Sequence, residues 1–219
     1  PHFGTRRAGY NAVNVERLNG GEEPMKFAAV GCLVLLVIVG VAVMFGVGAY
    51  NRLVALDEGV DSAWAQVENV YQRRADLVPN LVATVKGSAE FEQETLAAVV
   101  EARGKVGQMS FENAPDAAQM AQFQQAQDGL SSALSRLLVV VERYPDIKST
   151  QAFRDLMVQL EGTENRITVE RHRFNEVARE FNTMRRTFPS SLIANFFGFE
   201  EKVYFEAVEG AETAPVVEF

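Results

Sequence analysis

The stretch FAAVGCLVLLVIVGVAVMFGVGAY, from Phe27 to Tyr50, decides the first part of the fold. It contains no charged side chain, and a helix of this length measures about 36 Å at 1.5 Å per residue, enough to cross a hydrocarbon layer of roughly 30 Å. A soluble protein would have to cover every side of such a helix. The stretch therefore predicts a transmembrane helix, which we place at residues 25–50.

The single cysteine, Cys32, lies inside this apolar run, so no disulfide within the chain is possible. Lipidation of Cys32 would replace the protein anchor by an acyl chain. Most of the apolar residues follow Cys32, whereas a signal peptide places its apolar region before the cleavage site. We therefore favour a membrane helix over a lipoprotein.

Residues 1–24 form a polar N-terminal extension without hydrophobic periodicity, and they lead to Met25 and Lys26. Two interpretations stay open: Met25 is the native start, or the extension is a genuine disordered tail. Lys26 on one side of the apolar run against Arg52 on the other does not assign the side of the membrane on which the following domain lies. If the extension is native, Arg6, Arg7 and Arg17 favour a cytoplasmic N-terminus and an exported domain.

Long helices are expected over residues 51–188, because apolar residues recur at alternating spacings of three and four. Pro79 predicts a kink or a restart in the first of these helices, and Asp116 is expected to cap the third. The last one is expected from about Ser149 to Arg186. The expected apolar seams are Leu53, Leu56, Val60, Ala63, Val67, Val70, Arg74 and Leu77; then Met120, Phe123, Gln127, Leu130, Leu134, Leu137 and Val141; then Phe153, Leu156, Leu160, Thr163, Ile167, Glu170, Phe174, Val177, Phe181 and Met184.

Together these patterns predict an all-α protein: an N-terminal transmembrane helix followed by an elongated antiparallel bundle of long helices with coiled-coil-like spacing. Residues 189–219 are expected to form an aromatic cap on one end of the bundle and an acidic C-terminal tail, whose last ten or so residues are disordered. A partner-binding or membrane-surface patch is the alternative interpretation of these aromatic residues.

Three polar residues, Arg74, Gln127 and Glu170, occupy positions on the seams. An unpaired charge in a bundle core costs several kcal/mol. One hypothesis is that Arg74 and Glu170 meet; the other is that the seam drifts and both side chains are solvated.

The composition argues against several functions. The chain carries 29 acidic and 21 basic residues, a net charge of −8, and it lacks the basic face that a nucleic-acid-binding protein needs. Neither His2 nor His172 stands in a metal or catalytic motif. We therefore expect no enzyme activity, no cofactor and no metal, and no nucleic-acid partner.

Several motifs in the chain are specific enough to compare with known families: Leu56-Asp57-Glu58, Ala63-Trp64-Ala65-Gln66-Val67, YQRRADLVPNLV from Tyr71 to Val82, Thr84-Val85-Lys86-Gly87, Glu164-Asn165-Arg166-Ile167, Phe174-Asn175, Phe181-Asn182 and Phe188-Pro189. These motifs resemble the LemA family of bacterial proteins. The resemblance covers roughly residues 25–205. It implies one membrane helix, a long-helix bundle and no assigned enzymatic activity. Related domains in proteins of magnetosome membranes suggest a role in membrane organisation.

On this basis we expect a membrane-anchored helical scaffold or interaction protein that self-associates, or alternatively an adaptor regulating a membrane-bound kinase or protease. It is expected to be a single-pass protein of the bacterial inner membrane, with the lipid bilayer, copies of itself and possible membrane proteins as partners. The candidate structural or interaction cluster comprises Arg73, Arg74, Asp76, Pro79, Asn80, Asn165, Arg166, Glu170, Asn175 and Asn182.

Overall fold

The structure, a computed structural model, describes residues 23–87 and 92–206. The predictions made for the N-terminal extension before Glu23 and for the final acidic residues fall outside these ranges. Throughout the described ranges the regular structure is α-helical, which confirms the all-α class. The helices are α1 (Glu23–Lys86), α2 (Gln93–Val106), α3 (Ala117–Val141), α4 (Pro145–Lys148), α5 (Gln151–Arg186) and α6 (Ser190–Phe197).

The chain divides into two units, Pro1–Gly48 and Ala49–Phe219. In the described part of the first unit, the apolar side chains that follow Phe27 are exposed. The most apolar window of α1 has a mean hydropathy of 3.0 and none of it is buried, which makes α1 a candidate membrane span by length and composition. A bilayer is the environment in which such a surface is stable.

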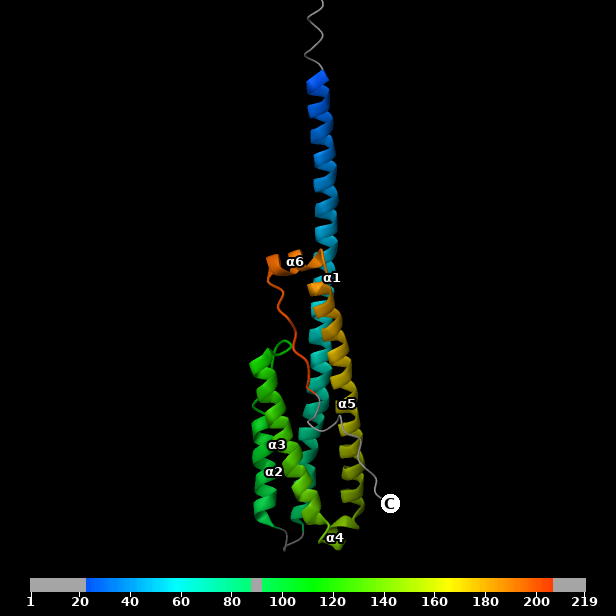
Figure 1. Ribbon diagram of the computed structural model, residues 1–219. Coiled ribbons are helices and arrows are strands. Elements are labelled where there is room, and N and C mark those ends of the chain that lie inside the picture. Colours follow the sequence, from blue (N-terminus) through cyan, green and yellow to red (C-terminus); the bar gives the residue numbers. More distant parts are fainter. Residues whose placement is uncertain (1–22, 88–91, 207–219) are drawn as a thin grey trace, which may run out of the picture. The chain divides into compact units, whose positions relative to one another are not determined.

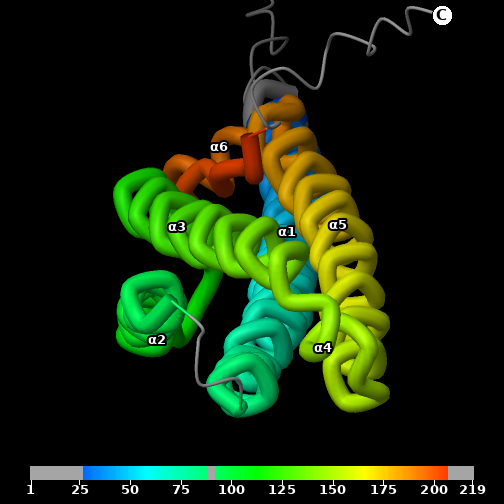
Figure 2. Tube along the Cα trace, turned by 90° about the horizontal axis from the view of Figure 1, so that it is seen from below, coloured from blue at the N-terminus to red at the C-terminus, as the bar shows by residue number. Residues whose placement is uncertain are grey.

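The second unit is a bundle of long helices. Figures 1 and 2 show α5 lying beside α1 and α2 lying beside α3, with the short α4 connecting α3 to α5. α5 alone spans 36 residues, about 54 Å at 1.5 Å per residue. This arrangement agrees with the predicted bundle of long helices.

The helix ends follow the capping signals in the sequence. The Asp116 carboxylate accepts a hydrogen bond from the Gln119 backbone N–H, and the Gln119 side chain accepts one from the Asp116 N–H, which completes a capping box for α3. The Thr150 hydroxyl accepts from the Phe153 N–H at the start of α5. Gly198, with φ 74°, ends α6 in the left-handed conformation that glycine adopts without strain.

Helix α1 does not end at Pro79. The prediction of a restart at this proline is wrong, because α1 continues for seven residues beyond it, to Lys86. A proline inside a helix leaves the carbonyl four residues earlier without its usual donor, and a neighbouring helix replaces that donor, as described below.

Two groups of buried side chains form the core of the bundle. The aliphatic cluster consists of Ala75, Val78, Leu81, Val85, Leu96, Val99, Val106, Leu130, Leu134, Leu137, Val140, Val141, Ile147, Phe153 and Leu160. The aromatic cluster consists of Leu53, Val60, Ala63, Trp64, Val67, Tyr71, Met120, Phe123, Ile167, Phe174, Ala178, Phe181, Ala194 and Phe205. α2 contributes only to the aliphatic cluster, and α6 only to the aromatic one.

The predicted seam of α3 is buried at every position. The seam of α1 shifts along the helix: Leu56, Val70 and Leu77 are only half-buried, while Trp64 and Tyr71, predicted to flank the seam, are buried. A straight helix drifts by about 20° per heptad. Positions spaced strictly by three and four therefore do not stay on the buried face along the whole of α1.

Candidate functional site

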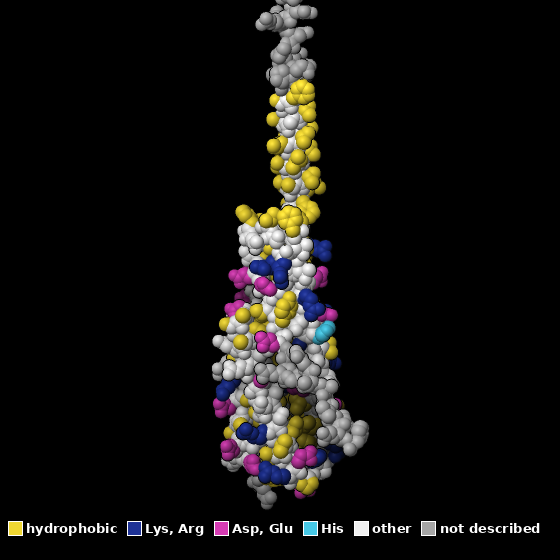
Figure 3. Space-filling view, in the orientation of Figure 1, with side chains coloured by type: hydrophobic (Ala, Val, Ile, Leu, Met, Phe, Trp, Pro, Cys, Tyr) yellow, Lys and Arg dark blue, Asp and Glu magenta, His cyan; other side chains and the backbone are white. Residues whose placement is uncertain are grey.

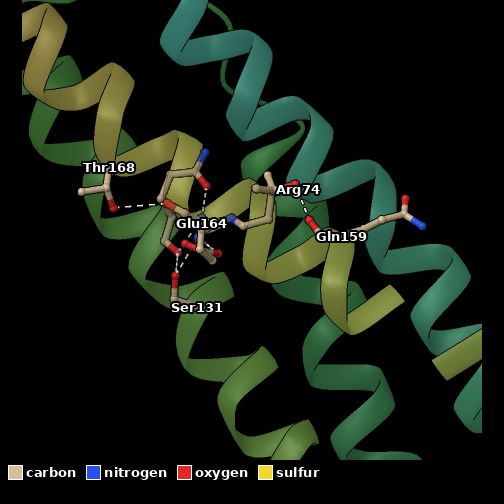
Figure 4. A network of polar contacts seen from close by, with 7 residues as sticks. Arg74, Ser131, Gln159, Glu164 and Thr168 are labelled. Atoms are coloured by element: carbon tan, nitrogen blue, oxygen red, sulfur yellow. Dashed lines mark hydrogen bonds and ion pairs between the residues drawn. The ribbon is translucent and has the colours of Figure 1, made fainter. Parts of the chain in front are cut away.

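Arg74 of α1 lies at the centre of a buried polar network, with only 2% of its side chain exposed. Its Nη1 donates to the Ser131 hydroxyl of α3 and to Glu164 Oε1 of α5, each at 2.9 Å. Its Nη2 donates to both the backbone carbonyl and the side-chain amide oxygen of Gln127. Figure 4 shows the guanidinium between the three helices. One charged side chain thus fixes the register of α1, α3 and α5.

The proposed pairing of Arg74 with Glu170 is wrong. The partner is Glu164, six residues earlier on α5, about 9 Å away along the helix axis at 1.5 Å per residue. Glu164 adjoins the buried Thr163, so its long side chain reaches the core from the edge of the seam while nearly half of it stays in water. Glu170 lies 3.9 Å from Arg173 of its own helix.

Tyr71 stands one helical turn before Arg74, and its ring centroid lies 5.1 Å from the guanidinium carbon. Burial raises the pKa of the Tyr71 hydroxyl above 10.0, although the positive charges of Arg171 and Arg74 act in the opposite direction. The phenol therefore stays neutral inside the core and offers the arginine an aromatic face.

The carbonyl of Ala75 is the one that Pro79 leaves without a helical donor. Arg103 of α2 donates to it through Nε at 3.0 Å. The proline in the RRADLVPNLV motif thus creates an acceptor on the surface of α1, and α2 docks on it. The sequence predicts a polar cluster beside Pro79, but it gives no signal for Arg103, which lies in a different helix.

An extended segment, Phe199–Glu206, which we call the C-terminal strap, runs along α5. Asn182 Nδ2 donates to the Lys202 carbonyl at 2.7 Å, and the Lys202 N–H donates back to Asn182 Oδ1 at 2.9 Å. Asn175 forms the same pair of bonds with Phe205, at 3.0 and 2.8 Å. Each asparagine therefore binds the strap as a neighbouring β-strand would, with one donor and one acceptor.

Further contacts hold both ends of the strap. Arg185 donates to the Phe199 carbonyl at 2.7 Å and Arg171 to the Glu206 carbonyl at 2.9 Å. The Phe205 ring enters the aromatic cluster, with its centroid 6.0 Å from that of Trp64 and 5.5 Å from that of Phe174. The strap thus covers one side of the aromatic cluster.

The candidate cluster predicted from the sequence is not one site. Arg74 belongs to the buried network, and Asn175 and Asn182 belong to the strap. The exposed members are Arg73, Asp76, Pro79, Asn80, Asn165 and Arg166; Glu170 is half-buried. Sequence reasoning missed Ser131, Glu164, Arg103, Arg171 and Arg185; the repeat Phe174-Asn175 and Phe181-Asn182, seven residues apart, was the available signal for the strap.

The cavity that Arg74 helps to line is small. It measures about 10 Å³ and is lined by Arg74, Leu77, Val78, Leu81, Leu134, Leu156 and Leu160. A single water molecule needs about that much space. His172 is exposed and lies 3.6 Å from Glu176 on the same helix face. Over residues 23–87 and 92–206, no group of three His, Cys, Asp or Glu side chains is arranged to hold a metal ion.

An open groove of about 930 Å³ lies between α2 and α3. Several of the residues that line it are small: Ala98 and Ala102 on α2, and Ala126, Gly129 and Ala133 on α3. Charged and amide side chains line it as well, namely Glu101, Lys105, Gln108, Gln122, Gln125 and Arg136. We refer to it as the α2–α3 groove.

Comparison with known proteins gives consistent matches. The chain is 26% identical over 187 residues to the magnetosome protein MamQ 2 of Paramagnetospirillum magneticum, covering 77% of this chain and 68% of that protein. It is 25% identical over 190 residues to the magnetosome protein MamQ of Magnetospirillum gryphiswaldense, with the same coverage of 77% and 68%. It is 22% identical over 177 residues to the protein LemA of Metamycoplasma hominis, covering 81% and 78%.

The sequence pattern of the LemA family matches residues 63–219, which include most of α1 beyond the candidate span, the whole α2–α6 region and the strap. Together with the candidate span, these similarities support a membrane-associated protein. The match covers well over half of the chain, and the chain belongs to the LemA family.

Proposed function

We propose that this protein is a membrane-anchored helical scaffold that self-associates through the α2–α3 groove and helps to organise the membrane in which it sits. In this proposal it is a single-pass protein of the bacterial inner membrane and performs no catalysis. The observation that carries the proposal is the groove itself. The alanine and glycine residues that line it allow a second helix to approach closely.

The charges of the groove favour a second copy as its occupant. Glu101 and Lys105 lie on α2, and Arg136 lies on α3 across the groove. When two copies associate about a twofold axis, the same surface of each copy forms the interface, so a residue pair made in one direction is also made in the other. Glu101 of one copy can then pair with Arg136 of the other, and the reverse. Two of the relatives described above are named as magnetosome proteins, which supports a role in organising membranes.

Filling the groove tests the proposal. Gly129→Leu places a large side chain in the groove. A Cβ added at Gly129 meets no atom within 4 Å, so the fold of the monomer can accept the change. Gly162→Leu on α5 is the matched control, because Gly162 is also helical and its Cβ would likewise meet nothing within 4 Å. Both substitutions replace a poor helix former by a good one.

The mass of the full chain is measured by light scattering in detergent and in nanodiscs. We expect a defined oligomer for the unaltered chain and for Gly162→Leu, and a shift toward the monomer for Gly129→Leu. A monomer in every sample contradicts self-association and favours the adaptor hypothesis. An oligomer that is equally stable in all three chains contradicts the assignment to the groove.

A further inference from the structure

Helix α6 exposes a set of large apolar side chains at one end of the bundle. Leu192 is 61% exposed and Phe196 82%, and the preceding Phe188 is 76% exposed. The opposite face of α6 packs inward through Ser190 and Ala194, which are buried. Figure 3 shows hydrophobic side chains gathered at this end of the bundle, which Figure 1 identifies as the end carrying α6.

The C-terminal end of α6 packs against Tyr50 of α1. The Tyr50 ring lies 4.6 Å from that of Phe197 and 5.9 Å from that of Phe199, measured between centroids. Tyr50 is also the last residue of the uncharged stretch that forms the candidate span. Tyrosine at the end of a span typically lies at the level of the lipid headgroups, so α6 contacts the residue at which the chain leaves the membrane.

The sequence of α6 suits that level. No charged side chain occurs from Thr187 to Phe199, whereas Arg185 and Arg186 precede this segment and Glu200 and Glu201 follow it. An amphipathic helix with aromatic side chains on one face is stable at the boundary of headgroups and acyl chains, where the apolar face enters by about 5–10 Å. A soluble protein surface rarely exposes three neighbouring large apolar side chains without a partner.

We propose that α6, together with Phe188, is a second membrane contact: Phe188, Leu192 and Phe196 insert into the surface of the same bilayer that α1 spans. The span and α6 then attach the bundle at two points and restrict its tilt relative to the membrane. This inference requires α1 to be embedded in the bilayer, but it does not depend on self-association through the α2–α3 groove.

A fluorescence experiment on the full chain tests this contact. Cys32→Ser removes the native thiol, and Phe196→Cys then carries an environment-sensitive NBD label. The matched control is Val158→Cys, because Val158 is 69% exposed on α5 and lies 28 residues before the end of that helix, about 42 Å along its axis. The proteins are reconstituted into phosphatidylcholine vesicles with or without lipids that carry a nitroxide near the headgroup, and flotation separates the bound protein.

We expect both labelled proteins to float with the vesicles. The label at position 196 is expected to show blue-shifted emission and several-fold stronger quenching by the nitroxide lipids than the label at position 158. Equal quenching at both positions in floating protein overturns the contact while leaving the anchor intact. A blue shift at 196 without lipid quenching identifies a protein surface as the occupant and also overturns it.

Lipid charge provides a second measurement. Because the inserted residues are uncharged, quenching at position 196 is expected to be the same in phosphatidylcholine vesicles and in vesicles containing phosphatidylglycerol. Quenching that occurs only with the anionic lipid assigns the contact to Arg185 and Arg186 and overturns insertion of the apolar face.

Discussion

The two core clusters of the bundle are completed in different ways. Helices α1, α3 and α5 contribute side chains to both clusters. The aliphatic cluster is completed by a fourth helix, α2, whereas the aromatic cluster is completed by α6 and the extended strap. In both, side chains bind the backbone of another segment: Arg103 reaches the Ala75 carbonyl, and Asn175 and Asn182 pair with the strap. The comparison shows that three long helices form the common frame and that specific polar side chains attach the fourth segment.

Truncation of one residue in each cluster gives the largest expected effects. Phe174 and Leu137 are both fully buried. Phe174→Ala is expected to lower the free energy of unfolding by about 3–5 kcal/mol and Leu137→Ala by about 2–5 kcal/mol. The measurement is urea denaturation of the full chain in detergent, followed by circular dichroism.

Hydrogen exchange separates the two variants. The Phe174 ring contacts the Phe205 ring of the strap, whereas Leu137 belongs to the other cluster. Phe174→Ala is therefore expected to accelerate amide exchange in residues 199–206 more than Leu137→Ala does. Equal acceleration in the strap would show that the two clusters unfold as one unit.

The sequence predicts the helical frame well because its signals are local. A buried seam spaced by three and four identifies α3 completely, and Asp116 marks its start. The same rule fails gradually along α1. An α-helix has 3.6 residues per turn, so positions spaced alternately by three and four move away from the core face, and Trp64 and Tyr71 are buried although they flank the predicted seam.

The contacts between distant segments were not predictable in the same way. Arg74 was expected to need a carboxylate, but whether Glu164 or Glu170 meets it depends on the axial offset between α1 and α5, which no local pattern encodes. The strap reads Phe-Glu-Glu-Lys-Val-Tyr-Phe-Glu, without the alternation of polar and apolar residues that would predict a strand. Its pairing with Asn175 and Asn182 depends on side-chain amides that take the place of a neighbouring strand.

The next largest effect is expected from Asn182→Ala, which weakens the attachment of the strap to α5. Asn182→Ala leaves both the Lys202 N–H and the Lys202 carbonyl without their partner, and unpaired polar groups cost about 1–3 kcal/mol when they are buried. We expect faster amide exchange around Lys202 and a smaller change in the rest of the bundle. Asn165→Ala, at an exposed asparagine of the same helix, is the matched control and is expected to leave exchange in the strap unchanged. If Asn182→Ala instead accelerates amide exchange equally along the whole of α5, Asn182 stabilises the helix and does not specifically hold the strap.

The smallest expected effect, and the most specific, concerns the docking of α2 on the proline of α1. Arg103→Leu removes the donor to the Ala75 carbonyl, and the net value of such a hydrogen bond is about 0.5–1.5 kcal/mol. Pro79→Ala restores a helical N–H that can donate to the same carbonyl, so the loss caused by Arg103→Leu should shrink in that background. A double-mutant cycle on the free energy of unfolding measures the difference directly.

Pro79→Ala by itself is expected to stabilise α1, because a proline inside a helix costs about 3 kcal/mol relative to alanine. The cycle does not depend on that gain, since only the difference between the two Arg103→Leu effects enters it. If the substitution at Arg103 costs the same with Pro79 and with Ala at that position, the guanidinium is not compensating for the missing donor. If the cost falls by about 1 kcal/mol, the proline serves to expose an acceptor, and α2 is attached to the aliphatic cluster in the way that the strap is attached to the aromatic one.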